Sequence, residues 1–399
     1  MLASTSSRLV RQANLYRLSS LRFLSSTSRV CNRAIIFSAN GPPTEVLRVA
    51  SFPDLPPPQP NSLNIRFLLS PINPSDINVV EGVYPAKPEA RTNLSEQEPG
   101  STKEPCFVVG NEGVAEVSQV GDGVQNLKVG DRVVMVKPQA GTWSTGATVR
   151  EQDVVKVPSV DGKDVSDVQA ATMSVNPPTA YNMLKNFVDL REGDWVVQNG
   201  ANSAVGQAVI QIAACRGLKT LNFIRDRPDF SALAKQLQDL GATHVLPLET
   251  LADKATRSKT KQLTDNANIR LALNCVSGPT TAALVGLLGQ DAHLVSYGAM
   301  SKQPLSLPTS AFIFKGLTAH GFMQNRWYRE NGIEKREELM RELASMMVAG
   351  KLQEPVHTIL DIPRSISDEE ALARVRDVIA KVTDGSGKFG KKVLLKFES

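Results

Sequence analysis

Residues 193–206, with the sequence GDWVVQNGANSAVG, decide the fold of this chain. The apolar run 195–197 follows a Gly-Asp turn and predicts a buried strand. A loop of small residues comes next, and from Ala204 apolar residues recur at helical spacing until Gly217, which can cap the helix. Strand, tight loop and helix N-terminus together present backbone N–H groups to a pyrophosphate, although Ala204 stands where the usual fingerprint has its middle glycine. The stretch predicts a dinucleotide site, and the alternative is an ordinary tight turn of an α/β sheet.

The next strand indicates which dinucleotide binds. Residues 218–224 predict a strand parallel to the first, and Arg225, Asp226 and Arg227 follow it. An acidic side chain at this place accepts hydrogen bonds from the ribose hydroxyls of NAD, whereas arginine pairs with the 2′-phosphate of NADP. Two guanidinium groups around one carboxylate favour NADPH, because each can bind the phosphate bidentately. The alternative is a solvated charged turn before the predicted helix 228–242.

Further strands follow in the middle of the chain. Apolar runs at 243–248, 271–276 and 294–297 predict strands, and helical stretches separate them. This alternation predicts a doubly wound parallel sheet of the Rossmann type.

Both ends of the chain are rich in strands. Before the sheet, strands are predicted at 34–37, 45–49 and 64–69 and between 107 and 136, with a hairpin turn at 40–43. After it, the sequence predicts helices at 336–348 and 368–382 and a last strand at 391–397. Residues 86–105 are polar and predict a surface loop. The expected arrangement is a β-rich domain made from both ends of the chain, with a nucleotide-binding domain inserted into it.

The N-terminal segment differs from the rest in charge. The 399 residues have a formal net charge of +5, but residues 1–44 contain no acidic residue and six arginines: Arg8, Arg11, Arg17, Arg22, Arg29 and Arg33. Subtracting these six charges leaves −1, which offers no argument for nucleic-acid binding. A segment rich in arginine, serine and leucine is typical of mitochondrial presequences, so we expect residues 1–33 to direct the protein to the matrix. A basic tail on a cytosolic enzyme is the alternative. No apolar run approaches the length of a membrane span.

Cysteine and histidine residues are scattered, and no CxxC pair is present. This pattern suits a reducing compartment and predicts no metal site. Cys215 and Cys275 are expected in the core. We interpret all eight residues as structural: Cys31, Cys106, Cys215, Cys275, His244, His293, His320 and His357.

Several blocks of sequence, taken in order, resemble the medium-chain dehydrogenase/reductase superfamily and, within it, the mitochondrial trans-2-enoyl-thioester reductases. They are PINPSDIN (71–78) with Tyr84, VGNEGVAEV (109–117), NPPTAY (176–181), NSAVGQAVIQIAA (202–214), IRDRPD (224–229), LALNCV (271–276) and YGAMSKQP (297–304). The resemblance implies NADPH as cofactor and a Rossmann domain inserted into a GroES-like β-rich catalytic domain. The implied division is a presequence at 1–33, a catalytic domain at 34–175 and 319–399, and an NADPH-binding domain at 176–318.

The zinc ligands of the alcohol dehydrogenases in this superfamily have no counterpart here. The first ligand region reads Asn-Pro-Ser-Asp at 73–76, the second reads Gly-Asn-Glu at 110–112, and no four-cysteine lobe is present. Without thiolates and imidazole a tetrahedral zinc site cannot be built. The resemblance therefore implies a site without metal.

Such a site suits the reduction of an activated C=C bond, and the resemblance implies NADPH-dependent reduction of trans-2-enoyl thioesters in mitochondrial fatty acid synthesis. Hydride reaches the β-carbon, a proton must reach the α-carbon, and hydrogen-bond donors must stabilise the enolate oxygen. The resemblance places the proton-donating tyrosine at Tyr84. A phenol with a pKa of about 10 holds its proton at working pH. The alternative is a tyrosine that simply packs on Pro85.

The resemblance also implies the cofactor contacts, with Asn176 beside the nicotinamide ribose or the substrate. The expected set is Asn176, Asn202, Ser203, Ala204, Val205, Arg225, Asp226, Arg227, Tyr297, Gly298, Ala299, Met300, Phe322, Met323, Gln324 and Lys391. Asn176 could instead form an Asx turn before Pro177, and Lys391 could be a solvated charge on the last strand. Met323 stands where the family usually has tryptophan, so the acyl-chain preference could differ from that of relatives.

The implied partners are a trans-2-enoyl-CoA or enoyl-ACP substrate, an acyl carrier protein and a second copy in a homodimer. An acyl carrier protein would be acidic, and four basic residues could face it: Lys302, Lys315, Arg326 and Arg329. Two other functions stay open. One is a zinc-free quinone or enone reductase, and the other is a non-enzymatic homologue that binds RNA or protein.

Overall fold

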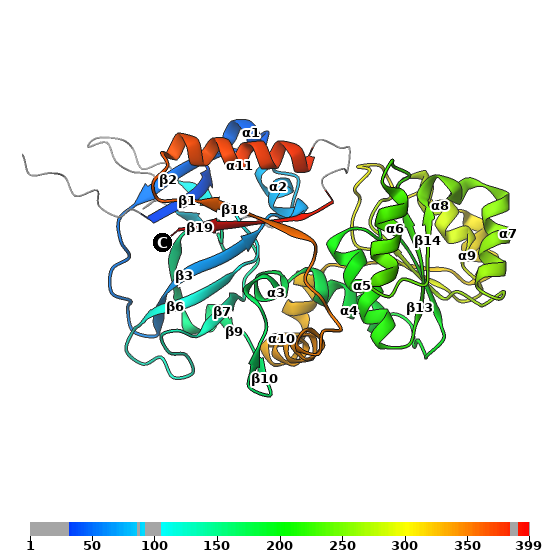
Figure 1. Cartoon of the computed structure of the whole chain (residues 1–399), viewed down its shortest axis with the longest axis horizontal. Helices are drawn as coiled ribbons and strands as arrows, with labels where there is room; N and C mark the ends of the chain where they lie inside the picture. The colour runs from blue at the N-terminus through cyan, green and yellow to red at the C-terminus, as the bar shows by residue number, and fades with distance from the viewer. Residues whose placement is uncertain (1–31, 86–87, 92–104, 384–389, 399) are drawn as a thin grey trace, which may run out of the picture.

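The structure is a computed structural model and describes residues 32–85, 88–91, 105–383 and 390–398. Figure 1 shows two lobes side by side, a β-rich lobe built from both ends of the chain and an α/β lobe built from its middle. The predicted presequence and most of the predicted loop at 86–105 lie outside the described residues. Among the helices that the structure describes, none is long and apolar enough to span a membrane.

The α/β lobe contains a six-stranded parallel sheet with the spatial order β14-β13-β12-β15-β16-β17. The strands are β12 (Trp195–Asn199), β13 (Lys219–Ile224), β14 (His244–Pro247), β15 (Leu271–Asn274), β16 (His293–Ser296) and β17 (Thr318–Gly321). The chain runs outward from β12 to β14 and then returns to pair β15 with β12. Ligands of open α/β sheets bind at such a reversal of strand order. The predicted Rossmann sheet is confirmed.

Helices surround this sheet (Figure 1). They are α4 (Asn176–Lys185), α5 (Ala204–Cys215), α6 (Phe230–Asp239), α7 (Lys254–Leu263), α8 (Pro279–Gly286) and α9 (Thr309–Lys315), with a 3₁₀ turn at Leu248–Ala252. The predicted helix after the glycine loop begins at Ala204 as expected, and Gly217 follows its end with φ +67°. Cys215 is the last residue of α5 and is exposed, so its expected place in the core was wrong, whereas Cys275 is buried.

The β-rich lobe is built around a seven-stranded sheet with the order β18-β19-β3-β6-β7-β9, in which β8 also pairs with β3. The strands are β3 (Ser62–Pro71), β6 (Val114–Val120), β7 (Arg132–Met135), β8 (Gly146–Arg150), β9 (Val154–Lys156), β18 (His357–Ile362) and β19 (Lys392–Phe397). Because β19 pairs antiparallel with β3, the last strand of the chain lies beside an early one. This pairing confirms that both ends of the chain build the lobe.

Smaller sheets and several helices complete the β-rich lobe. The sheets contain β1 (Asn32–Phe37), β2 (Arg48–Phe52), β4 (Ala90–Arg91) and β5 (Cys106–Val108), and β10 (Ser159–Val160) with β11 (Lys163–Asp164). The helices are α1 (Pro43–Val46), α2 (Pro74–Val80), α3 (Asp167–Thr172), α10 (Gln324–Val348) and α11 (Asp368–Thr383), with a 3₁₀ turn at Glu151–Asp153.

Two predicted boundaries were wrong. The strand expected at 45–49 begins only at Arg48, because Pro43 is the first residue of a helical turn between β1 and β2. The helix expected from Arg336 begins at Gln324 and bends at Gly332, which has φ +73° and ψ 179°. The apolar periodicity that predicts a helix is present only in the second half of α10. Residues 324–335 are mainly polar and lack it, so the first half was not predicted.

Candidate active site

The loop between β12 and α5 fits the phosphates of a dinucleotide. Ser203 caps α5, and its Oγ accepts a hydrogen bond from the backbone N–H of Gly206 at 3.1 Å. A Cβ at Gly206 would lie 2.5 Å from the carbonyl oxygen of Ala201, so a side chain there cannot be accommodated. Gly200 has φ +60°, and a Cβ there would lie 2.4 Å from Cys275 Sγ. The backbone is therefore free of side chains where the positive end of the α5 dipole attracts an anion.

Buried asparagines hold the carboxyl ends of neighbouring strands together beside this loop. Asn199 Nδ2 donates to Asn274 Oδ1 at 2.8 Å, and the N–H of Cys275 donates to Asn199 Oδ1 at 2.9 Å. Asn274 Nδ2 in turn donates to Ser296 Oγ at 3.0 Å. These bonds tie the carboxyl ends of β12, β15 and β16 together, at the edge of the sheet where the strand order reverses and ligands of such sheets bind. Sequence reasoning missed them, although an asparagine at the end of a buried strand was a signal.

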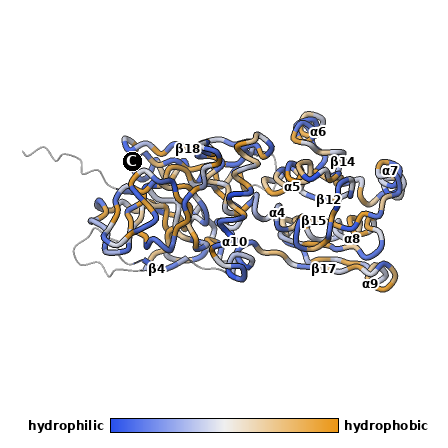
Figure 2. The backbone as a smooth tube through the Cα atoms, turned by 90° about the horizontal axis from the view of Figure 1, so that it is seen from below, coloured by the Kyte–Doolittle hydropathy of each residue, from blue (hydrophilic) through white to orange (hydrophobic). Residues whose placement is uncertain are grey.

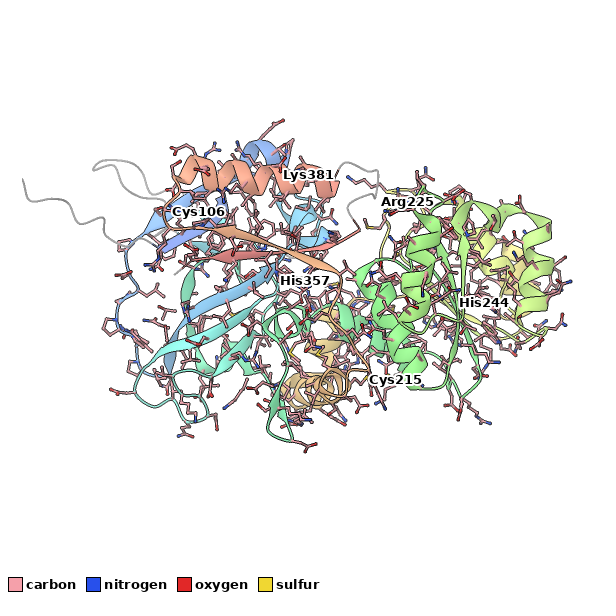
Figure 3. All side chains as sticks on the ribbon, in the orientation of Figure 1. Cys106, Cys215, Arg225, His244, His357 and Lys381 are labelled. Carbon is pink, nitrogen blue, oxygen red and sulfur yellow. The ribbon has the colours of Figure 1, made fainter. Side chains whose placement is uncertain are left out.

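The charged turn after β13 lies at the same edge of the sheet, because β12 and β13 are parallel neighbours. Arg225 and Asp226 are exposed, and Figure 3 shows Arg225 on the side of the α/β lobe that faces the β-rich lobe. Arg227 contacts Asp229 through two hydrogen bonds of 2.5 and 2.9 Å. A phosphate at Arg227 would therefore compete with a carboxylate for the guanidinium group.

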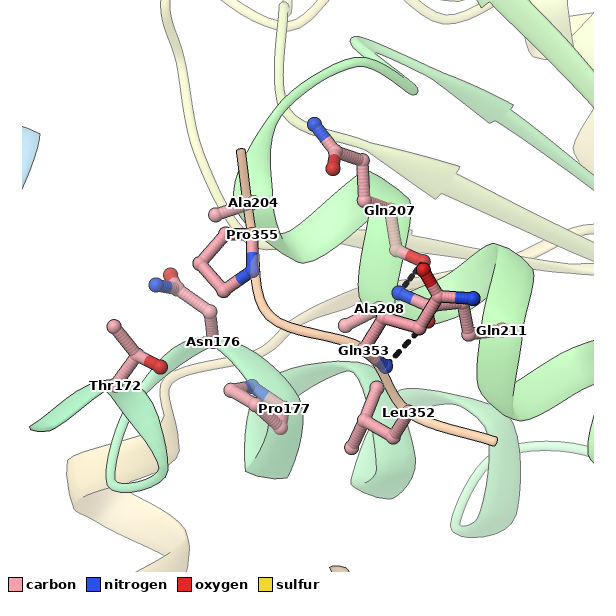
Figure 4. A pocket seen from close by; sticks show the side chains of 10 residues that line it. All are labelled: Thr172, Asn176, Pro177, Ala204, Gln207, Ala208, Gln211, Leu352, Gln353 and Pro355. Atoms are coloured by element: carbon pink, nitrogen blue, oxygen red, sulfur yellow. Dashed lines mark hydrogen bonds between the residues drawn. The ribbon is translucent and has the colours of Figure 1, made fainter. Parts of the chain in front are cut away.

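A pocket with an empty volume of about 300 Å³ opens between α4, α5 and the chain after α10 (Figure 4). Asn176 lines it, is 8% exposed, and has an amide Nδ2 without a hydrogen-bond partner among the described residues. The N–H of Gln353 donates to Gln211 Oε1 at 2.7 Å, which brings the segment from the β-rich lobe against α5. A buried donor without a partner calls for an acceptor, so Asn176 is available to a ligand in the crevice.

The loop after β16 borders this edge as well. Tyr297 has a buried hydroxyl, and burial, with the nearby Cys275 thiol as a second cause, raises its pKa well above the usual value. The N–H of Met300 donates to the carbonyl of Cys275 at 2.9 Å, and the Met300 side chain is exposed. Gly298 and Ala299 lie between Tyr297 and Met300 in this loop.

The residues after β17 turn towards the β-rich lobe. The N–H of Phe322 donates to the carbonyl of Ser296 at 2.9 Å, and Met323 is partly buried before the start of α10. Gln324 is buried, and its Oε1 accepts from Asn182 Nδ2 at 3.1 Å. Its Nε2 finds no acceptor within the described ranges.

Tyr84 follows helix α2 and is half-buried. Its backbone N–H donates to the carbonyl of Asn78 at 3.2 Å, and its ring packs against the apolar cluster that contains Ile72 and Ile77. Burial raises the pKa of the phenol, and the negative charge of Asp76 raises it further. The proton therefore stays on Tyr84 at neutral pH.

A buried polar cluster that sequence reasoning missed anchors α2. Asp76 is fully buried, and its two oxygens accept from the backbone N–H groups of Asn73 at 2.7 Å and Asn111 at 2.9 Å. Asn73 Nδ2 donates to Glu112 Oε1 at 2.8 Å. Lys392 of β19 donates to Asn73 Oδ1. One ammonium group therefore lies among two buried carboxyl groups.

The charges of this cluster perturb each other. Burial raises the pKa of Asp76 to about 7, against the backbone hydrogen bonds and the positive charge of Lys392 that lower it. Burial also raises the pKa of Glu112 and lowers that of Lys392. Lys391, the lysine singled out in the sequence, is exposed and lies just before β19. Successive residues of a strand face opposite sides, which explains why Lys392, and not Lys391, reaches the buried cluster.

Among the described residues, no group of three or more His, Cys, Asp or Glu side chains is placed to hold a metal ion. Polar anchoring of α2 comes from Lys392 and two asparagines instead.

Comparison with known proteins identifies the family. Residues 59–159 match the model of the alcohol dehydrogenase GroES-like domain, and residues 204–345 match that of the zinc-binding dehydrogenases. The mitochondrial enoyl-[acyl-carrier-protein] reductase of Yarrowia lipolytica is 40% identical over 356 residues, which cover 89% of this chain and 90% of that protein.

Solved structures agree with the sequence relatives. The mitochondrial 2-enoyl thioester reductase Etr1p/Etr2p heterodimer from Candida tropicalis superposes with a TM-score of 0.83 at 32% identity, over 92% of this chain and 99% of that one. The complex of Etr1p with NADP and crotonyl-CoA gives a TM-score of 0.84 at 31% identity and the same coverage. Both lobes are therefore shared, and the chain belongs to the family of the mitochondrial enoyl-[acyl-carrier-protein] reductases, within the medium-chain dehydrogenase/reductase superfamily.

Proposed function

We propose that this protein reduces trans-2-enoyl thioesters to acyl thioesters with NADPH, in the mitochondrion. The observation that carries the proposal is the relation, over nine-tenths of the chain, to a protein solved with both NADP and crotonyl-CoA. The glycine loop of this chain fits the phosphates of that cofactor, and an arginine-containing turn lies beside it. The arginine-, serine- and leucine-rich composition of the predicted presequence at 1–33 supports the mitochondrial location.

Bound NADPH supplies the hydride that reaches the β-carbon of the enoyl group. As the new C–H bond forms, the electron pair of the C=C bond moves onto the thioester oxygen, and donors in the crevice stabilise this enolate. The pair then returns to form a C–H bond at the α-carbon with a proton from Tyr84. The phenol O–H bond breaks, and the phenolate takes up a proton from water. Because burial and Asp76 raise the pKa of Tyr84, the donor is protonated before each turnover.

The cofactor would lie along the carboxyl edge of the Rossmann sheet. Residues 202–205 and the N-terminus of α5 would hold the pyrophosphate, and Arg225 and Arg227 the 2′-phosphate. Asn176, residues 297–300 and residues 322–324 would surround the nicotinamide end. Lys391 would reach the cofactor from its exposed position just before β19. The same assignment places the NADPH-binding domain at 176–318 and the catalytic domain at 34–175 and 319–399.

We further propose a homodimer that forms at β17. This strand is the edge of the six-stranded sheet, and no strand of the described residues covers its outer side. Helix α9 beside it exposes three large apolar side chains, Phe312 at 41%, Ile313 at 67% and Phe314 at 74%. Figure 2 shows this hydrophobic helix at the periphery of the molecule. An open edge with an apolar patch is suited to a second copy of the chain.

An acyl carrier protein is the proposed natural carrier of the substrate. Of the four basic residues considered, Lys302, Arg326 and Arg329 are exposed. Lys315 is unsuited, because its ammonium donates to the carbonyl of Leu288 at 2.6 Å and burial lowers its pKa. Lys302 Nζ lies 3.9 Å from a carboxylate oxygen of Glu81 in the other lobe, so Lys302 borders the crevice that a carrier-bound acyl chain would enter.

The decisive experiment measures NADPH oxidation by the purified full-length chain with crotonyl-CoA and, in parallel, with a quinone. We expect a far higher kcat/KM for the thioester. Comparable rates, or a preference for the quinone, would support the enone or quinone reductase alternative and overturn the substrate assignment.

A further inference from the structure

The turn that joins β13 to α6 carries both an arginine and a carboxylate that binds it. Arg227 Nε donates to one carboxylate oxygen of Asp229 at 2.5 Å, and Arg227 Nη2 donates to the other at 2.9 Å. The side chain of Arg227 is 18% exposed, and that of Asp229 is 58% exposed. A guanidinium group binds a phosphate in the same bidentate geometry. One edge of this guanidinium group is therefore already occupied by an anion of the chain itself.

Asp229 does not make the contact that its place in the chain favours. It is the N-cap of α6, where an aspartate side chain ordinarily accepts a hydrogen bond from an N–H group of the first turn. The side chain of Asp229 makes no such bond. The hydrogen bond from Arg227 lowers the pKa of Asp229, so the carboxylate is charged at neutral pH. Asp229 is thus held by Arg227 and not by the helix that it begins.

The main chain of the turn is held by other contacts. The N–H of Asp226 donates to Glu249 Oε2 at 2.8 Å, and Glu249 lies in the 3₁₀ turn that follows β14. Because β13 and β14 are parallel neighbours, this bond fixes the turn at the carboxyl edge of the sheet. The N–H of Phe230 donates to the carbonyl of Arg227 at 2.9 Å. The Arg227 side chain can therefore exchange its partner while these backbone bonds stay in place.

We propose that Asp229 is a specificity-determining residue, which competes with the 2′-phosphate of NADPH for Arg227 and so limits the preference for NADPH over NADH. The inference rests on the proposed function, since it concerns the cofactor of the same reaction. NADPH must displace the carboxylate from the Nε edge of Arg227, whereas NADH carries no phosphate at this place. Asp229 therefore weakens the binding of NADPH and leaves that of NADH unchanged. The displaced carboxylate can cap α6, which reduces the cost of the exchange.

Asp229→Asn tests the competition, because asparagine keeps the size of the side chain and is an equally good N-cap, but carries no charge that attracts Arg227. Calorimetry with adenosine 2′,5′-bisphosphate and with 5′-AMP isolates the contribution of the 2′-phosphate, since neither compound can react. In the full-length chain, Asp229→Asn should raise the ratio of the two affinities by about two- to fivefold, as expected for an exposed ion pair that no longer has to be broken. Asp229→Ser, a second uncharged cap, should act in the same direction.

Asp239→Asn is the matched control. Asp239 is the last residue of the same helix, and it pairs with Lys235 at 3.0 Å, away from the turn. Its replacement removes the same charge from α6 and should leave the ratio of affinities unchanged.

A double-mutant cycle with Arg227→Ala separates competition from a general effect of charge. Where Arg227 is absent, Asp229→Asn should no longer change the ratio. An equal rise with and without Arg227 overturns the proposal, because Asp229 would then act only as a nearby negative charge. An unchanged ratio in Asp229→Asn alone overturns it as well. So does a lower ratio, since Asp229 would then orient Arg227 for the phosphate.

Reduction of crotonyl-CoA by NADPH distinguishes this inference from the proposed function. A natural chain that does not reduce crotonyl-CoA, although its affinity ratio responds to Asp229→Asn as expected, would overturn the proposed function and leave the competition for Arg227 intact. A natural chain that reduces crotonyl-CoA, with an affinity ratio that Asp229→Asn does not change, would leave the reductase intact and overturn the role of Asp229.

Discussion

Tyr84 holds its proton because it is partly removed from water and lies near the charge of Asp76. Replacement by phenylalanine keeps the ring that packs against the apolar cluster with Ile72 and Ile77 and removes only the acid. We expect Tyr84→Phe to lower kcat by about 10²–10⁴, the usual contribution of a general acid, with little change in NADPH affinity. Steady-state rates with crotonyl-CoA and NADPH binding by fluorescence check this.

Tyr181→Phe is the control for this substitution. The Tyr181 hydroxyl accepts from Lys185 at 3.2 Å on the surface of α4, so its loss should leave turnover unchanged. An undiminished kcat in Tyr84→Phe would remove the phenol from the mechanism.

Asp76 and Lys392 make the stability of the protein depend on pH. Burial raises the pKa of folded Asp76 from 3.8 to about 7, so the folded state binds more protons than the unfolded state between these values. Stability contributed by this group is therefore lost as the pH rises from about 4 to about 7. Because Lys392 lowers the pKa of Asp76, Lys392→Met should raise it and extend the loss to higher pH.

Denaturant unfolding at pH 5, 6, 7 and 8 measures this effect. In Lys392→Met, the loss of unfolding free energy between pH 5 and pH 8 should grow by up to about 1.4 kcal/mol, the limit reached when the pKa of Asp76 rises well above 8. Lys392→Arg should restore the natural profile in part. Lys396→Met, an exposed position of the same strand, should not alter it. A profile for Lys392→Met that parallels the natural one would show that the ammonium does not act on Asp76.

At the scale of elements, the strand–loop–helix unit and the turn after β13 act together, because parallel pairing of β12 and β13 places both at one edge. The glycines at 200 and 206 are required there by contacts that a Cβ would violate. We expect Arg225 and Arg227 to serve the ligand, and Arg227 also donates to Asp229. The loop should therefore set affinity for any nicotinamide dinucleotide, and the turn should set the preference for the phosphorylated form.

The double variant Arg225→Ala, Arg227→Ala tests this division. Charge-assisted hydrogen bonds to a phosphate contribute about 1.5–3 kcal/mol each, so the preference for NADPH over NADH should fall by tenfold or more. The ratio of kcat/KM values for the two cofactors measures it. Arg191→Ala is the control, since Arg191 is exposed before the opposite end of β12. An unchanged ratio would mean that the arginines are ordinary surface charges.

At the scale of the whole molecule, the exposed edge β17 and helix α9 indicate where a second copy docks. Ile313→Glu with Phe314→Glu places two charges in the apolar patch, and a buried charge without a partner opposes association. We expect the natural chain to sediment as a dimer and the double variant as a monomer in analytical ultracentrifugation.

Val129→Glu serves as the control, because Val129 is 61% exposed on the other lobe. It should sediment like the natural chain. A natural chain that is monomeric at micromolar concentration would contradict the proposed interface.

Most of the α/β lobe was predictable because its signals are local. The apolar run at 195–197, the small residues before α5 and the charged turn after β13 lie within 35 residues of one another and need no distant partner. Strand β17 was missed because it lacks such a local signal. Its four residues, Thr-Ala-His-Gly, have little apolar character, and only pairing with β16 makes them a strand.

The sequence by itself thus determined the nucleotide-binding unit, the cofactor type and the family, because residue types and spacings along the chain carry these. Only the tertiary structure decided which charged residues are buried. Lys392 meets Asn73 across 319 positions, and Arg336 meets Val136 across 200. In a sequence both residues resemble surface charges. Folding buries Arg336 and brings Lys392 into the polar cluster, and this makes Lys392 an anchor for α2 and Arg336 a buried cation held by backbone carbonyls.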